Sequence, residues 1–185
     1  MQRVIKLGGS LLQRPNLRQV IFDWLEKEPP ATNFVIVGGG GIIDAVRDFD
    51  SVHTPDQELI HWLCVDLLSA TQSLVASVFP EWVNITDRST LLAFTARRQE
   101  QKTAIIAVKT FYSADQDHGL SRDWNTTTDS IAAALAVHVD ADELVLFKSC
   151  EITHNDTKRM IKEGILDPTF EKISADVRKI RVVSP

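Results

Sequence analysis

Cysteine is scarce in this chain, and its placement matches no metal or disulfide pattern. The 185 residues include two cysteines, Cys64 and Cys150, and no C-x-x-C or H-E-x-x-H spacing. Structural zinc sites use four ligands, and small disulfide scaffolds use several cysteine pairs. Both cysteines stand in apolar sequence, so we expect two reduced, buried thiols of a cytoplasmic protein and no metal-ligand set.

Positive charge is also in short supply. Lysine and arginine number 20 against 25 aspartates and glutamates, which gives a net charge of −5 at pH 7. Proteins that bind nucleic acid through its phosphates carry basic patches or stripes, and none stands out here. We therefore expect no nucleic-acid partner. The ordinary shares of hydrophobic (44%) and charged (24%) residues favour a single domain over residues 1–185.

No hydrophobic run is long and unbroken enough to suggest a membrane span. The longest apolar stretch, residues 59–79, is interrupted by His61, Asp66, Thr71 and Gln72. This pattern predicts a buried amphipathic helix. A strand pattern begins at the third residue, so we expect neither a signal peptide nor a membrane partner.

Two glycine-rich motifs are present instead. The first is Lys6-Leu7-Gly8-Gly9-Ser10, directly after the apolar pair Val4-Ile5, and the second is Val37-Gly38-Gly39-Gly40-Gly41 at the end of the next short apolar run. A strand that ends in glycines leaves backbone N–H groups free to close on an anion, because no Cβ stands in the way. Two such loops, each between a strand and a helix, predict phosphate binding; a tight turn and close helix–strand packing are the structural alternatives.

The remaining pattern predicts an α/β fold with a mainly parallel central sheet and helices on both faces. Continuous apolar runs predict strands over residues 3–7, 34–37, 82–85, 104–108, 143–148 and 179–183. Helical spacing and capping residues predict helices over residues 16–27, 40–48, 55–77, 87–98, 127–138 and 155–163, with Thr54 and Asp87 as N-caps. Residues 109–126 are expected to form a long polar loop, and such loops are often functional.

Four polar clusters fall at the carboxyl ends of these strands, where open α/β sheets bind ligands. They are the two glycine loops, the segment that leads to Asp129, and Lys148. Lys6 and Lys148 offer positive charge to an oxyanion, and Asp129, at the start of a helix, could orient both lysines or hold Mg²⁺. Phosphoryl transfer asks mainly for such positioning and charge. A solvated lysine and a plain helix N-terminal carboxylate are the structural alternatives.

In order and spacing, these segments resemble the amino acid kinase family. The resemblance is carried by the two glycine motifs, by Thr127-Thr128-Asp129-Ser130 with Ile131-Ala132-Ala133, and by Leu144-Val145-Leu146-Phe147-Lys148. It implies a three-layer αβα sandwich that transfers phosphate from ATP, with Mg²⁺, to a carboxylate or phosphate on a small-molecule acceptor. Lys6 would stabilise the transferring group, Asp129 would organise the lysines, and Lys148 would lie on the nucleotide side. The candidate phosphate- or substrate-binding residues are Gly8, Gly9, Ser10, Gly38, Gly39, Gly40, His118 and Thr128.

A narrower resemblance points to one small subgroup. His61-Trp62 in the long helix, and His118-Gly119-Leu120 with Asp123-Trp124 in the polar loop, look like the kinases that phosphorylate an aminomethylfuran-methyl phosphate in methanofuran synthesis. The acceptor would then be a phosphate. Other acceptors used in the family, such as uridylate, isopentenyl phosphate or an amino acid, stay open.

The chain departs from the family after Lys148. Family members usually carry a longer C-terminal half with a G-G-M-x-x-K segment, which is absent here, and Ser149-Cys150-Glu151 replaces the usual Asp-Gly-Val. We expect residues 164–168, Gly-Ile-Leu-Asp-Pro, to stand in the corresponding place. This shortened C-terminal half leaves a second hypothesis, a ligand-binding protein that has lost catalysis. The long helix is apolar on more than one face, which predicts a homodimer.

Overall fold

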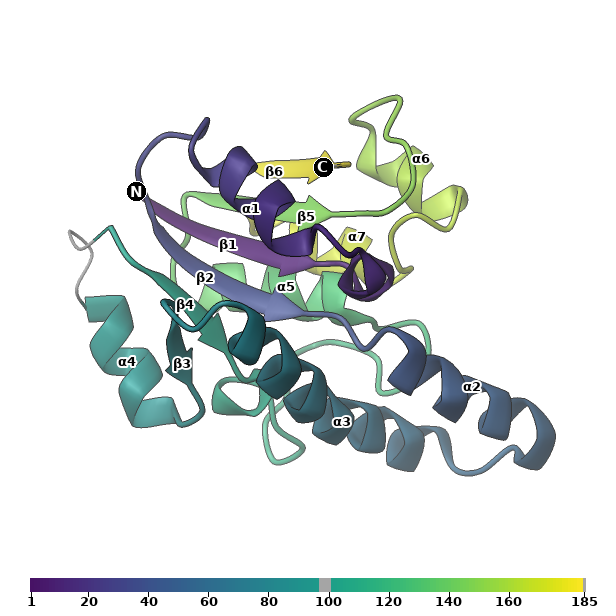
Figure 1. Ribbon diagram of the computed structural model, residues 1–185. Helices are drawn as coiled ribbons and strands as arrows, with labels where there is room; N and C mark the ends of the chain where they lie inside the picture. Colours follow the sequence, from purple (N-terminus) through teal and green to yellow (C-terminus); the bar gives the residue numbers. More distant parts are fainter. Residues whose placement is uncertain (97–100, 185) are drawn as a thin grey trace.

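The computed structural model describes residues 1–96 and 101–184 (Figure 1). Six strands form one sheet in the order β3-β4-β2-β1-β5-β6, and every pairing among the described residues is parallel. The strands are β1 (Gln2–Leu7), β2 (Thr32–Val37), β3 (Val83–Ile85), β4 (Thr103–Ile106), β5 (Glu143–Phe147) and β6 (Ile180–Val183).

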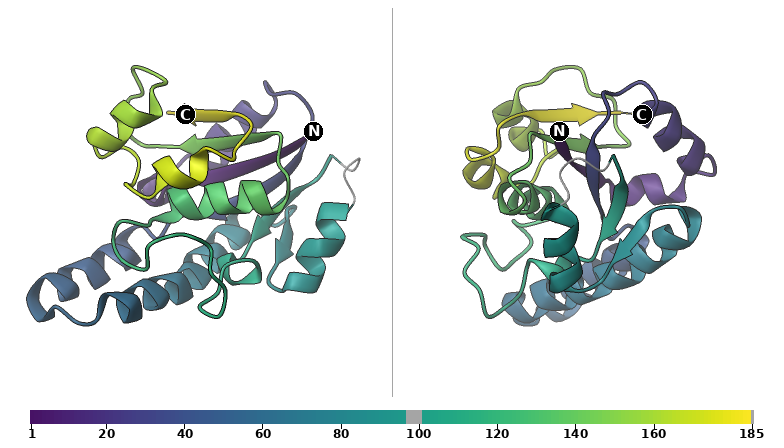
Figure 2. Two further views of the ribbon diagram at one scale, coloured as in Figure 1. Left: turned by 180° about the vertical axis from the view of Figure 1, so that it is seen from behind. Right: turned by 90° about the vertical axis from the view of Figure 1, so that its left-hand side faces the viewer.

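Helices cover both faces of this sheet. Helix α1 lies on one face, and α5 and α7 lie on the other (Figures 1 and 2). This is the three-layer αβα arrangement, so the predicted fold class is confirmed. The helices are α1 (Leu17–Leu25), α2 (Gly41–His53), α3 (Gln57–Val78), α4 (Arg88–Ala96), α5 (Thr128–His138), α6 (Thr157–Lys162) and α7 (Phe170–Ser174), with 3-10 turns η1 (Gly9–Gln13) and η2 (Val108–Thr110).

The central strands owe their sequence pattern to burial on both sides. Every residue of β1, β2 and β5 is buried. Val4 and Phe34 pack into the core under α5, whereas Ile5 and Val35 pack into the core under α1. Parallel strands covered by helices on both faces read as continuous apolar runs, which is why the sequence identifies them.

Of the two predicted N-caps, Thr54 for the long helix is wrong and Asp87 is confirmed. Thr54 has a φ of 42° and ends α2. Asp56 is the N-cap of α3, and its side chain accepts a hydrogen bond of 2.8 Å from Leu59 N. Asp87 accepts one of 2.9 Å from Thr90 N and begins α4 as predicted. The predicted end of that helix at residue 98 lies outside the described residues.

Other boundaries differ where local signals are weak. Helix α2 continues to His53, beyond the predicted residue 48, because neither glycine nor proline interrupts it. Helix α6 is shorter than predicted, and α7, η1 and η2 have no counterpart in the predictions. These segments are too short for hydrophobic periodicity to identify them.

Two predictions about burial are wrong. The segment predicted as a polar loop begins with η2, and Thr110, Phe111 and Tyr112 are buried against the core. Both thiols are free, but Cys64 is only partly buried and Cys150 is exposed. The apolar run before Cys150 ends with β5, so the thiol itself lies beyond the sheet.

Helix α3 joins the two cores. Among the described residues it is the one helix long and apolar enough to cross a membrane, a property that core helices share. Its first half packs Val65 and Leu68 into one core, and its second half packs Val75 into the other. The apolar side chains that it leaves exposed are Leu59, Leu63, Leu74 and Val78.

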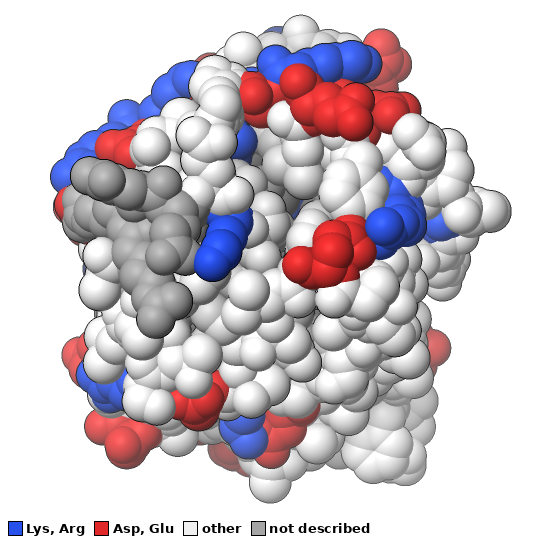
Figure 3. Space-filling model, turned by 60° about the vertical axis from the view of Figure 1, so that its left-hand side comes forward, with Lys and Arg blue, Asp and Glu red and all other residues white. Residues whose placement is uncertain are grey.

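A buried network of ion pairs holds the amino ends of the strands. Arg3, which is 1% exposed, donates to Glu143 Oε2 at 2.9 Å and to Asn33 Oδ1 at 3.3 Å. Arg181 donates to both carboxylate oxygens of Glu28, at 2.9 and 2.6 Å, and to Glu143 Oε2 at 3.1 Å. Basic and acidic side chains lie next to one another on this side of the molecule (Figure 3). The network ties β1, β5 and β6 together.

We expect Glu143→Gln to destabilise the fold by about 3 kcal/mol, because it removes the nearer of the two carboxylates that pair with the buried Arg3 guanidinium. Urea denaturation at pH 7 measures this loss. The matched control is Glu26→Gln at an exposed position, which should change the free energy of unfolding by less than about 0.5 kcal/mol.

The wild-type protein and the Glu143→Gln variant also allow a test of the pH dependence of stability. Burial acts to raise the pKa of Glu143, but hydrogen bonds from Lys179, Arg3 and Arg181 outweigh it and hold the pKa below 4.5. A lowered folded-state pKa contributes stability that is complete above the ordinary pKa and is lost as the pH falls through the lowered value. The stability difference between wild type and Glu143→Gln should therefore shrink below pH 4.5. A difference that stayed constant into strong acid would contradict this assignment.

Candidate active site

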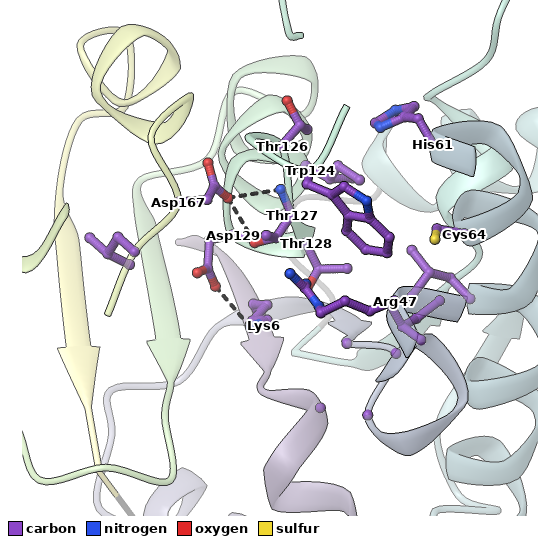
Figure 4. Close-up of a pocket in the computed structure, with 18 of the residues that line it drawn as sticks. Lys6, Arg47, His61, Cys64, Trp124, Thr126, Thr127, Thr128, Asp129 and Asp167 are labelled. Atoms are coloured by element: carbon purple, nitrogen blue, oxygen red, sulfur yellow. Dashed lines mark hydrogen bonds and ion pairs between the residues drawn. The ribbon is translucent and has the colours of Figure 1, made fainter. Parts of the chain in front are cut away.

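A cavity of about 670 Å³ opens at the carboxyl ends of β1, β2 and β5. Lys6, Asp129 and Lys148 line one part of it, and Arg47, His61 and Trp124 line another (Figure 4). The cavity therefore lies at the edge of the sheet where α/β proteins bind ligands.

Asp129 lies between two lysines. Its Oδ1 is 2.8 Å from Lys6 Nζ, and its Oδ2 is 2.5 Å from Lys148 Nζ. Lys6 belongs to β1 and is paired in register with Leu146 of the neighbouring strand β5, which Lys148 follows. Asp129 sits in the first turn of α5. The fold thus brings together the three residues that the sequence marks as candidate catalytic groups.

The three charged groups shift the pKa values of Asp129 and Lys148. Burial acts to raise the pKa of Asp129, but the charges of Lys6 and Lys148 outweigh it and hold the pKa below its ordinary value. Burial and the like charge of Lys6 lower the pKa of Lys148, against the attraction of Asp129. Two lysines and one carboxylate leave a net positive charge, which suits an anionic ligand.

The two glycine loops are in direct backbone contact. A Cβ at Gly9 would lie 2.3 Å from Gly40 N, and one at Gly38 would lie 2.6 Å from Gly9 N. Gly40 has a φ of 53°. Any larger residue would push the loops apart, so close packing is one reason for these glycines.

Residues of both loops also line the cavity. Gly9, Gly39 and Gly40 line it, and none of the described residues accepts a hydrogen bond from the N–H of Gly39 or Gly40. Gly9 opens η1, so its N–H belongs to the first turn, which has no partner within a helix. Unpaired donors beside two lysines fit the phosphates of a nucleotide or a phosphorylated ligand.

The other predicted binding residues divide into two groups. Ser10, Gly38 and Thr128 line the cavity, and Ser10 Oγ is 2.7 Å from Ser149 Oγ. Gly8 does not line it: its N–H donates to Phe147 O at 3.1 Å, and a Cβ there would lie 2.7 Å from that oxygen. His118 does not line it either.

His118 instead belongs to an aromatic cluster behind the cavity wall. Its Nε2 accepts a hydrogen bond of 3.2 Å from Ser113 N, and its ring centre lies 4.5 Å from that of Tyr112. The Tyr112 hydroxyl is 2.9 Å from Nε2 of His61, which does line the cavity. Burial raises the pKa of Tyr112 to about 12 and lowers the pKa of His61. Both shifts favour the uncharged forms of the two rings.

Sequence reasoning missed a second buried carboxylate, Asp167, in the segment 164–168. Its oxygens accept hydrogen bonds from Thr127 N (3.0 Å), Thr127 Oγ1 (2.7 Å), Ser130 N (3.1 Å), Ser130 Oγ and Phe170 N (3.0 Å). In the same segment, Ile165 O accepts from Lys148 Nζ. These contacts hold the first turn of α5 and therefore the position of Asp129. In the sequence, the one feature that could have indicated this buried carboxylate is an aspartate directly before Pro168.

The donor set does not form a protein cage for a metal ion. Across residues 1–96 and 101–184, no three His, Cys, Asp or Glu side chains cluster as metal ligands. Both oxygens of Asp129 face lysines, and Asp167 is occupied by donors of its own chain. Mg²⁺ is commonly held by substrate phosphates and few protein ligands, so it fits here only as part of a nucleotide complex.

Comparisons with known proteins give a family and a fold. A family model described as the amino acid kinase family matches residues 1–163. No curated protein matches the sequence. Among solved structures, uridylate kinase from Archaeoglobus fulgidus is similar over 100% of this chain and 91% of its own, with a TM-score of 0.67 and 16% identity.

Two further structures have the same fold. UMP kinase from Ureaplasma parvum has a TM-score of 0.67 and 14% identity, covering 100% of this chain and 89% of its own. UMP kinase from Bacillus anthracis has a TM-score of 0.66 and 12% identity, covering 99% and 86%. At these identities the likeness concerns the fold.

We expect Asp167→Ala to destabilise the fold by about 3 kcal/mol, because the donors of Thr127, Ser130 and Phe170 lose a buried acceptor. Asp167→Asn, which keeps one acceptor oxygen, should lose less. Asp156→Ala, the exposed N-cap of α6, is the matched control and should lose about 1 kcal/mol. Urea denaturation compares the three variants. Equal losses of stability in Asp167→Ala and Asp156→Ala would contradict the role of Asp167 in holding the first turn of α5.

Proposed function

The chain belongs to the amino acid kinase family, and from this we propose that it transfers the γ-phosphoryl group of ATP to a phosphate or carboxylate of a small acceptor. The single observation that supports this best is Asp129 between Lys6 and Lys148, beside the unpaired N–H groups of the glycine loops. A cytoplasmic location belongs to the same proposal.

Each residue of the trio has a distinct role in this proposal. Phosphoryl transfer shifts negative charge from the attacking oxygen to the leaving oxygen, so fixed cations near both oxygens lower the barrier. Lys6, at the first glycine loop, stabilises the group in transfer. Lys148, held by Ile165 O, serves the nucleotide side. Asp129 keeps both ammonium groups in place. Mg²⁺ carried on the nucleotide phosphates would neutralise part of their charge.

The acceptor in this proposal is a phosphorylated small molecule, and the methanofuran precursor is the leading candidate. His61 and Trp124, two residues of that narrower resemblance, line the cavity, which supports the assignment. Uridylate, isopentenyl phosphate and amino acids are the alternatives. A screen of these acceptors with coupled detection of ADP separates them, because one should have a much higher kcat/KM than the others.

The rival hypothesis is a ligand-binding protein without catalysis. The short segment after Lys148 favours it, because that part of the chain forms the nucleotide side of the cavity. The contacts of residues 164–168 with Lys148 and the start of α5 support the kinase, because they order the candidate catalytic trio without a longer C-terminal half.

We expect Lys6→Met to reduce phosphoryl transfer at least about 100-fold, because the lysine stabilises charge that develops in the transition state. Lys27→Met, at an exposed position away from the cavity, should leave the rate unchanged. Circular dichroism establishes that both variants fold.

We also expect saturable binding of a non-hydrolysable ATP analogue with Mg²⁺, weakened at least about tenfold in Lys148→Met. Isothermal titration calorimetry measures it. A folded wild-type protein that shows no binding at millimolar nucleotide would favour the non-catalytic hypothesis instead.

A homodimer is the last part of the proposal. Helix α3 exposes Leu59, Leu63, Leu74 and Val78, and large exposed apolar patches often mark interfaces. We expect light scattering after gel filtration to give twice the monomer mass, and Leu74→Glu to shift it toward the monomer. Leu92→Glu on α4 is the control. A monomer across a wide concentration range would rule out this interface.

A further inference from the structure

Beside the lysine pair, the cavity continues between α2, α3 and the loop that follows η2. Ile43 and Arg47 line it from α2, Ile60 and Cys64 from α3, and Trp124 from the loop. Apolar side chains from α3 lie on one side of this part, and the polar side chains of Asp44, His61 and Asp123 also line the cavity. Arg47 extends from α2 into the cavity, toward Thr128 (Figure 4). It therefore brings a cation close to the part of the site that holds Lys6.

An indole ring holds Arg47 in place. The guanidinium carbon lies 4.3 Å from the centre of the Trp124 ring. Trp124 Nε1 donates to Asp50 Oδ2 at 2.7 Å, and Asp50 Oδ1 accepts from Gln57 Nε2 at 3.0 Å. Asp50 lies one turn after Arg47 on α2, where an ion pair would normally form, but its two oxygens are used by Trp124 and Gln57.

This arrangement leaves Arg47 without a direct ion-pair partner among the described residues. Throughout the described ranges, no carboxylate forms an ion pair with it, although Asp44 and Asp123 also line the cavity. Asp123 accepts hydrogen bonds from the backbone and side chain of Asn125. Lys6 and Lys148, in contrast, share Asp129. An anionic group of the ligand is the natural partner for this guanidinium.

We propose that Arg47, stacked on Trp124, binds the phosphate group of a phosphate-monoester acceptor whose body is compact and mainly apolar. The inference rests on the proposed kinase function and names its acceptor class. A guanidinium presents two parallel N–H groups that match two oxygens of one oxyanion. A monoester has three terminal oxygens, so two pair with the guanidinium while the third attacks. A carboxylate that attacks with one oxygen has a single oxygen left.

The chemistry of this acceptor fits the groups present. A terminal oxygen of the acceptor phosphate forms a bond to the γ-phosphorus of ATP, the bond from that phosphorus to the bridging oxygen breaks, and ADP leaves. The product carries a phosphoanhydride. The second pKa of a phosphate monoester is about 6, so at neutral pH the attacking oxygen is already deprotonated. No general base is required, and His61, whose Nε2 is engaged by the Tyr112 hydroxyl, has no proton to remove.

The lining also limits the body of the acceptor. Ile60, Cys64 and Val65 offer apolar contact on the α3 side of the cavity. A nucleobase needs partners for the polar atoms on its edge, and leaving them unpaired lowers affinity. A short apolar or aromatic body avoids this loss.

The test is calorimetric titration of the full chain with benzyl phosphate, without nucleotide. Benzoate and UMP are the comparison ligands. We expect benzyl phosphate to bind at least about tenfold more tightly than either of them. Tighter binding of UMP would overturn the compact apolar body, and equal binding of benzoate would overturn the choice of phosphate. Absence of benzyl phosphate binding at millimolar concentration would overturn both the compact apolar body and the phosphate group of the proposed acceptor.

Arginine variants test the residue. Arg47→Gln should weaken benzyl phosphate binding at least about tenfold, and Arg47→Lys, which keeps the charge but loses the paired N–H groups, should recover only part of it. Arg159→Gln, on α6 and paired with Glu163, is the control and should bind normally. Normal binding by Arg47→Gln would overturn the assignment.

A double variant tests the role of the indole. Trp124→Phe removes the N–H that engages Asp50, so the freed carboxylate should pair with Arg47 and weaken benzyl phosphate binding. Adding Asp50→Asn removes that competing charge and should restore part of the affinity. Equal affinities of the single and double variants would overturn this part of the proposal.

The readouts keep the two proposals apart. Loss of nucleotide binding with intact benzyl phosphate binding would defeat the kinase and leave the acceptor class standing. Nucleotide binding and turnover with an unaffected Arg47→Gln variant would defeat the acceptor subsite alone.

Discussion

The candidate site depends on one carboxylate, Asp129, which pairs with two lysines at once. Lys6 and Lys148 lie at the ends of adjacent strands, where their like charges would repel in a poorly solvated place, and Asp129 compensates both. The fold supplies the three groups from β1, α5 and the end of β5. Asp167 then holds the first turn of α5, so the C-terminal segment takes part in setting the geometry of a site whose other residues come earlier in the chain.

The glycine loops show how one feature serves packing and binding together. Gly9 and Gly40 approach so closely that a side chain on either would displace the other loop. This contact lies where η1 and α2 begin, and Gly9, Gly39 and Gly40, whose N–H groups are the candidate donors, line the cavity. The packing alternative considered from the sequence and the phosphate-binding hypothesis are therefore compatible, because the tight contact is what arranges the donors.

Much of the fold follows from patterns that are local in sequence. Buried parallel strands are continuous apolar runs, so β1, β2 and β5 are easy to place, and the motif spacing brings Lys6, Asp129 and Lys148 to one edge. The missed features depend on contacts between distant residues. Arg47 looks like any surface arginine of α2 until Trp124 is seen against it, and the buried place of Tyr112 cannot be read from a segment that is otherwise polar. The prediction that Cys150 is buried is wrong because a neighbouring apolar run does not determine whether the residue after the strand end is covered.

The strand order has a consequence for how the protein is made. Strand β1 lies in the middle of the sheet, yet on one side it pairs with β5, and β5 pairs with β6, which ends at Val183. During synthesis, that side of the first strand is therefore covered only after residues 143–147 have been made. Long-range pairing of this kind slows folding and leaves a strand edge open to other chains meanwhile. The buried Arg3, which pairs with Glu143, makes the amino end of β1 among the last parts of the molecule to reach its final surroundings.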